Sequence, residues 1–260
     1  MNSFAEILVI ALFTAISCAL PGNFLVLRRM SMLTDAISHT VLLGIILAFL
    51  LTGSLDSPFL IVGATLMGVL TVWLVESLYR SRLVASDAAI GLIFPFLFSI
   101  AVILVTRYAG NVHIDTDCVL LGELAFAPFD RLIIDGTDYG ARGIYTSGIV
   151  FIIVAAIITL FYKELKLATF DPVLSKILGF SPALIHYGLM GLVSLTAVTA
   201  FQSIGSILVI AFMIIPAMTA SLWTKTMASR LLLSCLIGSF GSVAGIVGAI
   251  WLDTSLAGMM

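Results

Sequence analysis

Long apolar runs divide the chain into regularly spaced segments. Eight stretches of about 17 to 25 residues carry very few charged side chains. An α-helix rises about 1.5 Å per residue, so each stretch is long enough to cross a hydrocarbon layer of about 30 Å. The pattern predicts an all-α fold, a polytopic transmembrane helical bundle that occupies residues 1–260 as a single transmembrane domain. The expected spans lie near residues 5–27, 33–52, 58–79, 88–106, 143–162, 183–201, 204–224 and 230–252.

The basic residues sort into alternate loops between these spans. Nine of the twelve lysines and arginines fall in one set of loops, which the positive-inside rule assigns to the cytoplasm. The first apolar run is too long for a signal-peptide core and follows no basic segment, so we expect a retained span with its N-terminus outside. The nine residues are Arg28, Arg29, Arg80, Arg82, Lys163, Lys166, Lys176, Lys225 and Arg230.

The external loop of about residues 107–142 is long and acidic, with six acids against three arginines. Within it, His113, Asp115 and Asp117 alternate, so an extended segment would aim all three toward one side. They and Glu123 form a candidate entry or docking surface for a metal or its carrier. Because acids in a loop are easily solvated, the same residues also fit a plain solvated surface.

The cytoplasmic loop of about residues 163–182 contains a candidate short helix. Asp171 can cap it, Pro172 suits its first turn, and Gly179 suits its end. Three apolar residues of this helix would share one face, and that face could dock in a partner's groove or lie on the bilayer surface. These residues are Leu174, Ile177 and Leu178.

Composition supports a membrane protein, since 61% of the residues are apolar and 10% are charged, against about 25% charged in soluble domains. The net charge of −2 and the lack of a basic stripe argue against nucleic-acid binding. No P-loop, HExxH or GxSxG motif occurs, so the chain is not expected to be an enzyme, and an intramembrane enzyme is a remote alternative. Energy for active transport would come from another subunit or from an ion gradient.

Asp35 and His39 are the most informative polar residues inside an apolar run. They stand at i and i+4, so both side chains project from one helical face. With Arg29 at the membrane surface, His39 would lie about 15 Å deep, where ionisable groups are costly and usually functional. The pair offers a divalent cation one oxygen and one nitrogen, which suits Mn²⁺, Fe²⁺ or Zn²⁺. Two ligands hold a metal poorly, so a second subunit would have to supply the rest.

Other interpretations of these polar residues remain open. Asp35 could be a first-turn acid at a positive helix N-terminus, with His39 satisfied by a neighbouring helix. The pair could also relay protons. His186 follows Pro182 at a helix start and needs no special role there.

Four segments resemble the membrane permeases of bacterial metal-ion ABC importers, which take up manganese, zinc and iron with a soluble metal-binding protein. They are RRMSMLTDAISHTVLLG at 28–44, DTDCVLLGELAF at 115–126, FDPVLSKILGF at 170–180 and GSILVIAFMIIPAMTA at 205–220. Members of that family usually continue past a turn into another helix, whereas this chain ends with residues 253–260. The resemblance therefore leaves open whether a further C-terminal helix exists.

The resemblance implies a multi-pass protein of the bacterial cytoplasmic (inner) membrane. Two permeases, identical or different, would surround a central pore above two ATPase subunits, and Asp35 and His39 match the family's pore ligands. The segment from Pro172 would be the coupling helix on the ATPase, and the external loop would receive the metal-binding protein. The transported ion is expected to be manganese, with zinc or iron as alternatives. An importer of a metal chelate, siderophore-like or cobalamin-like, and an ion-gradient-driven metal carrier are the other transport hypotheses.

Overall fold

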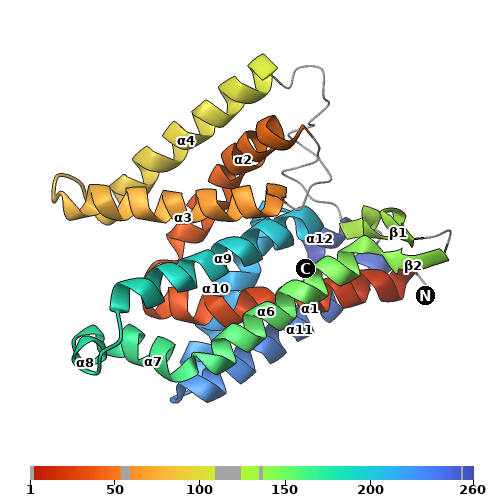
Figure 1. The fold of residues 1–260 in the computed structure, drawn as a ribbon. Coiled ribbons are helices and arrows are strands. Elements are labelled where there is room, and N and C mark those ends of the chain that lie inside the picture. Colours follow the sequence, from red (N-terminus) through yellow and green to blue (C-terminus); the bar gives the residue numbers. More distant parts are fainter. Residues whose placement is uncertain (1–2, 54–58, 109–123, 135–136, 253) are drawn as a thin grey trace.

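The computed structural model describes residues 3–53, 59–108, 124–134, 137–252 and 254–260, and Figure 1 shows a bundle of long helices. Eight helices are long and apolar enough to cross a membrane, which confirms the predicted fold class and spans. Their ends differ from the predicted ends by only a few residues. The helices are α1 (Ser3–Leu27), α2 (Met32–Thr52), α3 (Phe59–Arg80), α4 (Ser86–Tyr108), α6 (Arg142–Leu160), α9 (Pro182–Ile204), α10 (Ser206–Trp223) and α11 (Met227–Leu252).

Shorter elements occupy the two long loops and the end of the chain. The loop after α4 contains an antiparallel hairpin, which pairs Arg131 with Ala141 and Ile134 with Thr137. The apolar pattern did not predict this hairpin, although the Asp-Gly pair between its strands is typical of hairpin turns. The short elements are η1 (Leu124–Phe129), β1 (Arg131–Ile134), β2 (Thr137–Ala141), α7 (Tyr162–Phe170), α8 (Pro172–Ile177) and α12 (Leu256–Met259).

Helix α1 is the centre of the larger part of the bundle, where it packs against α6, α9, α10 and α11. Gly22 is where α1 meets α10, because a Cβ at that position would overlap the carbonyl oxygen of Met213. Beside it, the buried Asn23 Nδ2 donates to Ser234 Oγ of α11 at 2.6 Å. The close approach at Gly22 therefore fixes α1 against α10, and the hydrogen bond of Asn23 fixes it against α11.

Helices α2, α3 and α4 form a second group, visible at the top of Figure 1. The backbones of α2 and α3 approach closely at Gly44 and Gly63, where a Cβ at Gly44 would lie 2.5 Å from the Gly63 carbonyl oxygen. Further along, Thr71 Oγ1 donates to Thr40 Oγ1 at 2.8 Å. These two contacts set the position of α2 on α3, and α2 carries the candidate metal ligands.

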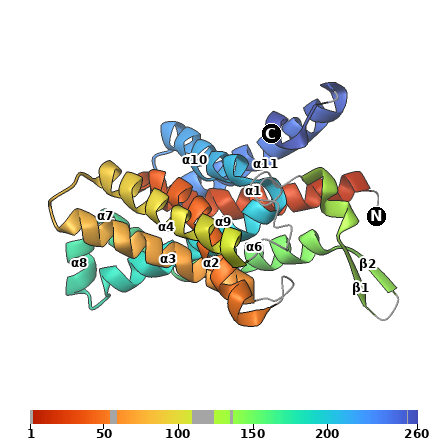
Figure 2. The same ribbon diagram turned by 90° about the horizontal axis from the view of Figure 1, so that it is seen from above.

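The loops separate into two ends of the bundle. The loops that follow α1, α3, α6 and α10 lie at one end, together with α7 and α8, and we call it the basic end. It holds the nine basic residues that sort into alternate loops. The N-terminus and the β1–β2 hairpin lie at the opposite end, as Figure 2 shows from above. This separation is what the loop charges require of a membrane protein.

Candidate functional site

The candidate metal ligands lie near the start of α2. Asp35 is in the first turn of the helix and His39 follows one turn later, about 10 Å along the axis from Met32. Asp35 Oδ1 lies 3.4 Å from His39 Nε2, so the two side chains do point toward each other. The Asp35 side chain is 50% exposed and that of His39 is 28% exposed. An oxygen and a nitrogen are therefore close together and still accessible.

Aromatic side chains from α4 orient the imidazole of His39. The ring lies 5.1 Å from the ring of Phe94 and 6.1 Å from that of Phe98, measured between centroids. Phe94 and Phe98 are one turn apart on α4, so both rings face α2. They cover part of the imidazole with apolar surface, which limits its rotation and leaves the Asp35 side open.

The described residues bring together only part of a candidate metal site. In the part of the chain that the structure describes, no three residues of the His, Cys, Asp and Glu types come close enough to hold a metal ion. Asp35 and His39 thus offer two ligands and an open side. Four coordination positions are the minimum that a tetrahedral site needs. Their role as metal ligands stays a prediction, and the four external candidates, His113, Asp115, Asp117 and Glu123, lie outside the described residues.

The short helix predicted in the loop of residues 163–182 is confirmed as α8. Asp171 Oδ1 accepts a hydrogen bond from Leu174 N at 2.9 Å, and Pro172 occupies the first turn. The helix ends at Ile177, and Gly179 then adopts a left-handed conformation with φ of +87°. The three apolar residues predicted to share a face, Leu174, Ile177 and Leu178, are all exposed, Ile177 to 75%. This face has no cover within the described part of the chain.

Comparison with known proteins identifies the family of this chain. The sequence profile of the ABC 3 transport family matches residues 1–260. The chain belongs to this family.

Two similar proteins are named as membrane proteins of metal transport systems. The manganese transport system membrane protein MntD of Bacillus subtilis (strain 168) is 45% identical over 260 residues, which cover all of this chain and 88% of MntD. The zinc transport system membrane protein TroD of Treponema pallidum (strain Nichols) is 48% identical over 255 residues, 98% of this chain and 69% of TroD. The expected resemblance to metal-ion permeases is confirmed.

A solved structure agrees with the ABC 3 family fold. PsaBC from Streptococcus pneumoniae, in complex with Fab, has a chain that superposes with a TM-score of 0.81 at 30% sequence identity. The superposition covers all of this chain and 87% of the other. The arrangement of the helices is therefore shared with that chain over the whole length of this one.

A polar cluster at the basic end of this ABC 3 family chain was missed by the sequence analysis. His186 Nε2 of α9 lies 2.5 Å from Glu76 Oε1 of α3, and Tyr187 donates to Glu76 Oε2 at 2.9 Å. Arg28, which follows α1, reaches His186 Nδ1 at 2.9 Å and Thr169 of α7 at 3.1 Å. We call these five residues the Glu76 cluster. His186 thus has a definite structural role, contrary to the expectation.

The hydrogen bond from Arg28 indicates which nitrogen of the His186 imidazole carries the ring hydrogen. A guanidinium can only donate, so Nδ1 accepts from Arg28 and the ring hydrogen lies on Nε2, facing the carboxylate of Glu76. Burial lowers the pKa of Arg28 from its usual value, and the nearby charge of Glu76 opposes that effect. The signal that could have revealed this cluster is an acid and an imidazole inside two apolar runs, at Glu76 and His186.

Proposed function

We propose that this chain is the permease subunit of an ABC importer that moves a divalent transition metal into the cytoplasm, with Mn²⁺ as the first choice and Zn²⁺ or Fe²⁺ as alternatives. The observation that carries the proposal is the pair Asp35 and His39, which presents an oxygen and a nitrogen 3.4 Å apart within a membrane span. Membership of the ABC 3 transport family supports a transport role, and MntD and TroD are named for manganese and zinc.

A second permease subunit, identical or different, would complete the site across a central pore. A facing Asp and His would bring the ligand count to four, and two carboxylates would neutralise the divalent charge. That neutralisation strongly lowers the cost of placing the ion in a medium of low dielectric constant. The exposure of Asp35 supports this arrangement, because the carboxylate still has an open side. Mixed oxygen and nitrogen ligands suit borderline ions and do not choose among them.

Helix α8 is proposed as the contact with a separate ATPase subunit. Its apolar residues Leu174, Ile177 and Leu178 are exposed at the basic end, and Asp171, Pro172 and Gly179 define the ends of the helix. The positive-inside rule assigns the basic end to the cytoplasm, which puts the N-terminus outside. Membership of the ABC 3 transport family supports a location in the inner membrane. A soluble metal-binding protein would then deliver the ion at the opposite end, where the external acidic loop begins.

The bare ion is favoured over a metal chelate as the cargo. A chelate already fills the coordination positions of its metal, so it gains little from a carboxylate and an imidazole one helical turn apart. An ion-gradient-driven carrier would also use such ligands, but it would need neither an ATPase nor the exposed face of α8. Uptake that proceeds in liposomes without any ATPase would favour that alternative.

Metal uptake into liposomes tests the proposal directly. The permease is reconstituted with its ATPase and its metal-binding protein, and uptake of radioactive Mn²⁺ is measured for Asp35→Ala and His39→Ala. Each variant loses one of four ligands if the second subunit is different and two if it is identical, so we expect uptake to fall at least tenfold while assembly and basal ATP hydrolysis persist. The control is Asp87→Ala, which removes an exposed acid from the first turn of α4. Normal uptake by both variants would contradict the site.

A further inference from the structure

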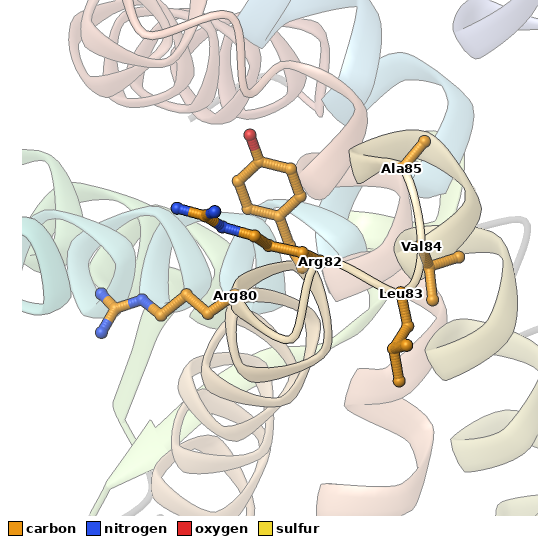
Figure 3. Close-up of a pocket in the computed structure, with 6 residues that line it drawn as sticks. Arg80, Arg82, Leu83, Val84 and Ala85 are labelled. Carbon is orange, nitrogen blue, oxygen red and sulfur yellow. The ribbon is translucent and has the colours of Figure 1, made fainter.

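The loop that joins α3 to α4 forms a pocket at the basic end of the bundle. Its volume is about 630 Å³. Figure 3 shows the side chains of Arg80 and Arg82 extending to one side of the loop, away from Leu83. The pocket is lined by Tyr79, Arg80, Arg82, Leu83, Val84 and Ala85. Two cations and several apolar side chains thus meet in one small concave surface.

We propose that this pocket binds the phosphate headgroup of an anionic phospholipid in the leaflet that faces the basic end. Arginine donates in a planar fork that matches two phosphate oxygens, and two such residues provide both charge and hydrogen bonds for one headgroup. Arg80 is 73% exposed, and its ion pair with Glu76 is long, at 3.6 Å. Arg82 is exposed, and its side chain has no acceptor among the described residues. Both guanidinium groups are therefore available to an anion.

The backbone conformation of Arg82 is one that rarely carries a side chain. Arg82 adopts a left-handed conformation with φ of +59°, in the turn where Arg82 N donates to Tyr79 O at 3.1 Å. Glycine is the residue that fits this position at a helix end without steric cost. An arginine there keeps a disfavoured backbone conformation, as Arg29 does after α1, and a use for its charged group agrees with that choice of residue.

The pocket continues an apolar face of α3. Exposed residues recur along one side of the helix, three or four positions apart, and the series ends at Arg80. Leu83, beside the pocket, is 85% exposed. Hydrocarbon covers such a face, tryptophan and tyrosine favour the membrane boundary, and arginine reaches headgroups there. This continuity favours a lipid over an acidic patch on a soluble partner. The series is Phe59, Val62, Leu66, Leu70 and Trp73, then the exposed Ser77, and it ends at Arg80.

Native mass spectrometry of the complex, purified with its partner subunits, measures the binding. Phosphatidylglycerol and phosphatidylcholine are titrated separately into wild type, Arg82→Asn, and Arg80→Gln combined with Arg82→Asn. Asparagine is used at position 82 because it tolerates the left-handed conformation. The control is Arg107→Gln, which removes an exposed arginine from the opposite end of α4. Each basic residue near an anionic surface contributes a factor of about five, so we expect phosphatidylglycerol affinity to fall about fivefold and tenfold or more, respectively.

Each outcome decides for or against a headgroup site. The proposal holds if both pocket variants lose phosphatidylglycerol, the Arg107 control does not, phosphatidylcholine binds weakly throughout, and Arg82→Lys keeps part of the affinity. Unchanged phosphatidylglycerol binding in the double variant overturns it. Full competition by millimolar inorganic phosphate would overturn the lipid source. A loss of ATPase or permease association with lipid binding unchanged would make the pocket a subunit contact. A lack of Mn²⁺ uptake by the wild type would defeat the proposed function alone.

Discussion

Replacing Glu76 by glutamine tests whether the Glu76 cluster stabilises the bundle. The change keeps the size of the side chain and removes its charge. The carboxylate is 18% exposed, and it accepts a hydrogen bond from Tyr187 at 2.9 Å. His186 Nε2 lies 2.5 Å from its other oxygen, and Arg80 is 3.6 Å away. Since Arg80 is largely exposed, its pair with Glu76 contributes little to stability. The two contacts from α9, the hydrogen bond from Tyr187 and the close polar contact of His186, therefore dominate the expected effect.

The magnitude follows from those two contacts. A hydrogen bond to a charged group contributes about 1.5 to 3 kcal/mol, whereas interhelical bonds measured in a membrane protein average about 0.6 kcal/mol. Glutamine can still accept one neutral bond from Tyr187. We therefore expect Glu76→Gln to lower the free energy of unfolding by about 2 kcal/mol. For a chain of this size that corresponds to a fall in Tm of about 4 to 8 °C.

Thermal unfolding of the purified permease in detergent, followed by intrinsic fluorescence, measures the change in Tm. The matched control is Asp87→Asn, the same carboxylate-to-amide change at an exposed position, for which we expect a change near zero. A double-mutant cycle with Tyr187→Phe adds a second criterion, because the tyrosine substitution should cost less once Glu76 is gone. A fall in Tm no larger than that of Asp87→Asn, with additive effects in the cycle, would refute the stabilising role of the cluster.

Three further predictions concern packing, coupling and metal binding. Gly22→Ala should lower Tm by several degrees, because the new methyl group overlaps the backbone of Met213; a Tm equal to the wild type would argue against that close approach. Ile177→Asp or Leu174→Asp should abolish the stimulation of ATP hydrolysis by the permease while the permease stays folded, and normal stimulation by both variants would reject α8 as the ATPase contact. Saturating Mn²⁺ at a hundredfold excess over its dissociation constant should stabilise the wild type by about 2.7 kcal/mol, reversibly with EDTA, and Asp35→Asn should lose most of this gain in differential scanning fluorimetry.

Features that depend on local sequence were predictable. The spans follow from apolar run length, because backbone polar groups must be satisfied within each helix that crosses a bilayer. Asp35 and His39 follow from i, i+4 spacing, and their proximity at 3.4 Å agrees with it. The α8 helix follows from Asp171 and Pro172, which act on the backbone a few residues away.

Features that depend on distant contacts were not predictable. Tyr187 and Glu76 are 111 positions apart, and Arg28 and His186 are 158 apart, so no local pattern joins them. The β1–β2 hairpin was missed because the loop was assessed only by its charge. The proposed second half of the candidate metal site would come from another subunit, and the pattern of one chain indicates only that the pair of ligands is incomplete.

The contact between α2 and α3 has a mechanical consequence for transport. Gly44 and Gly63 let the two backbones touch, and the hydrogen bond between Thr40 and Thr71 adds a second point of attachment. Two separate attachments prevent α2 from sliding along α3, since a shift of one residue would bring a side chain against the backbone at the glycine crossing. Asp35 lies on α2, so it would then move together with α3 as part of one rigid body. In the proposed two-subunit site, opening of a pore would change the distance between the candidate ligands of opposite subunits and leave the 3.4 Å spacing within each subunit intact.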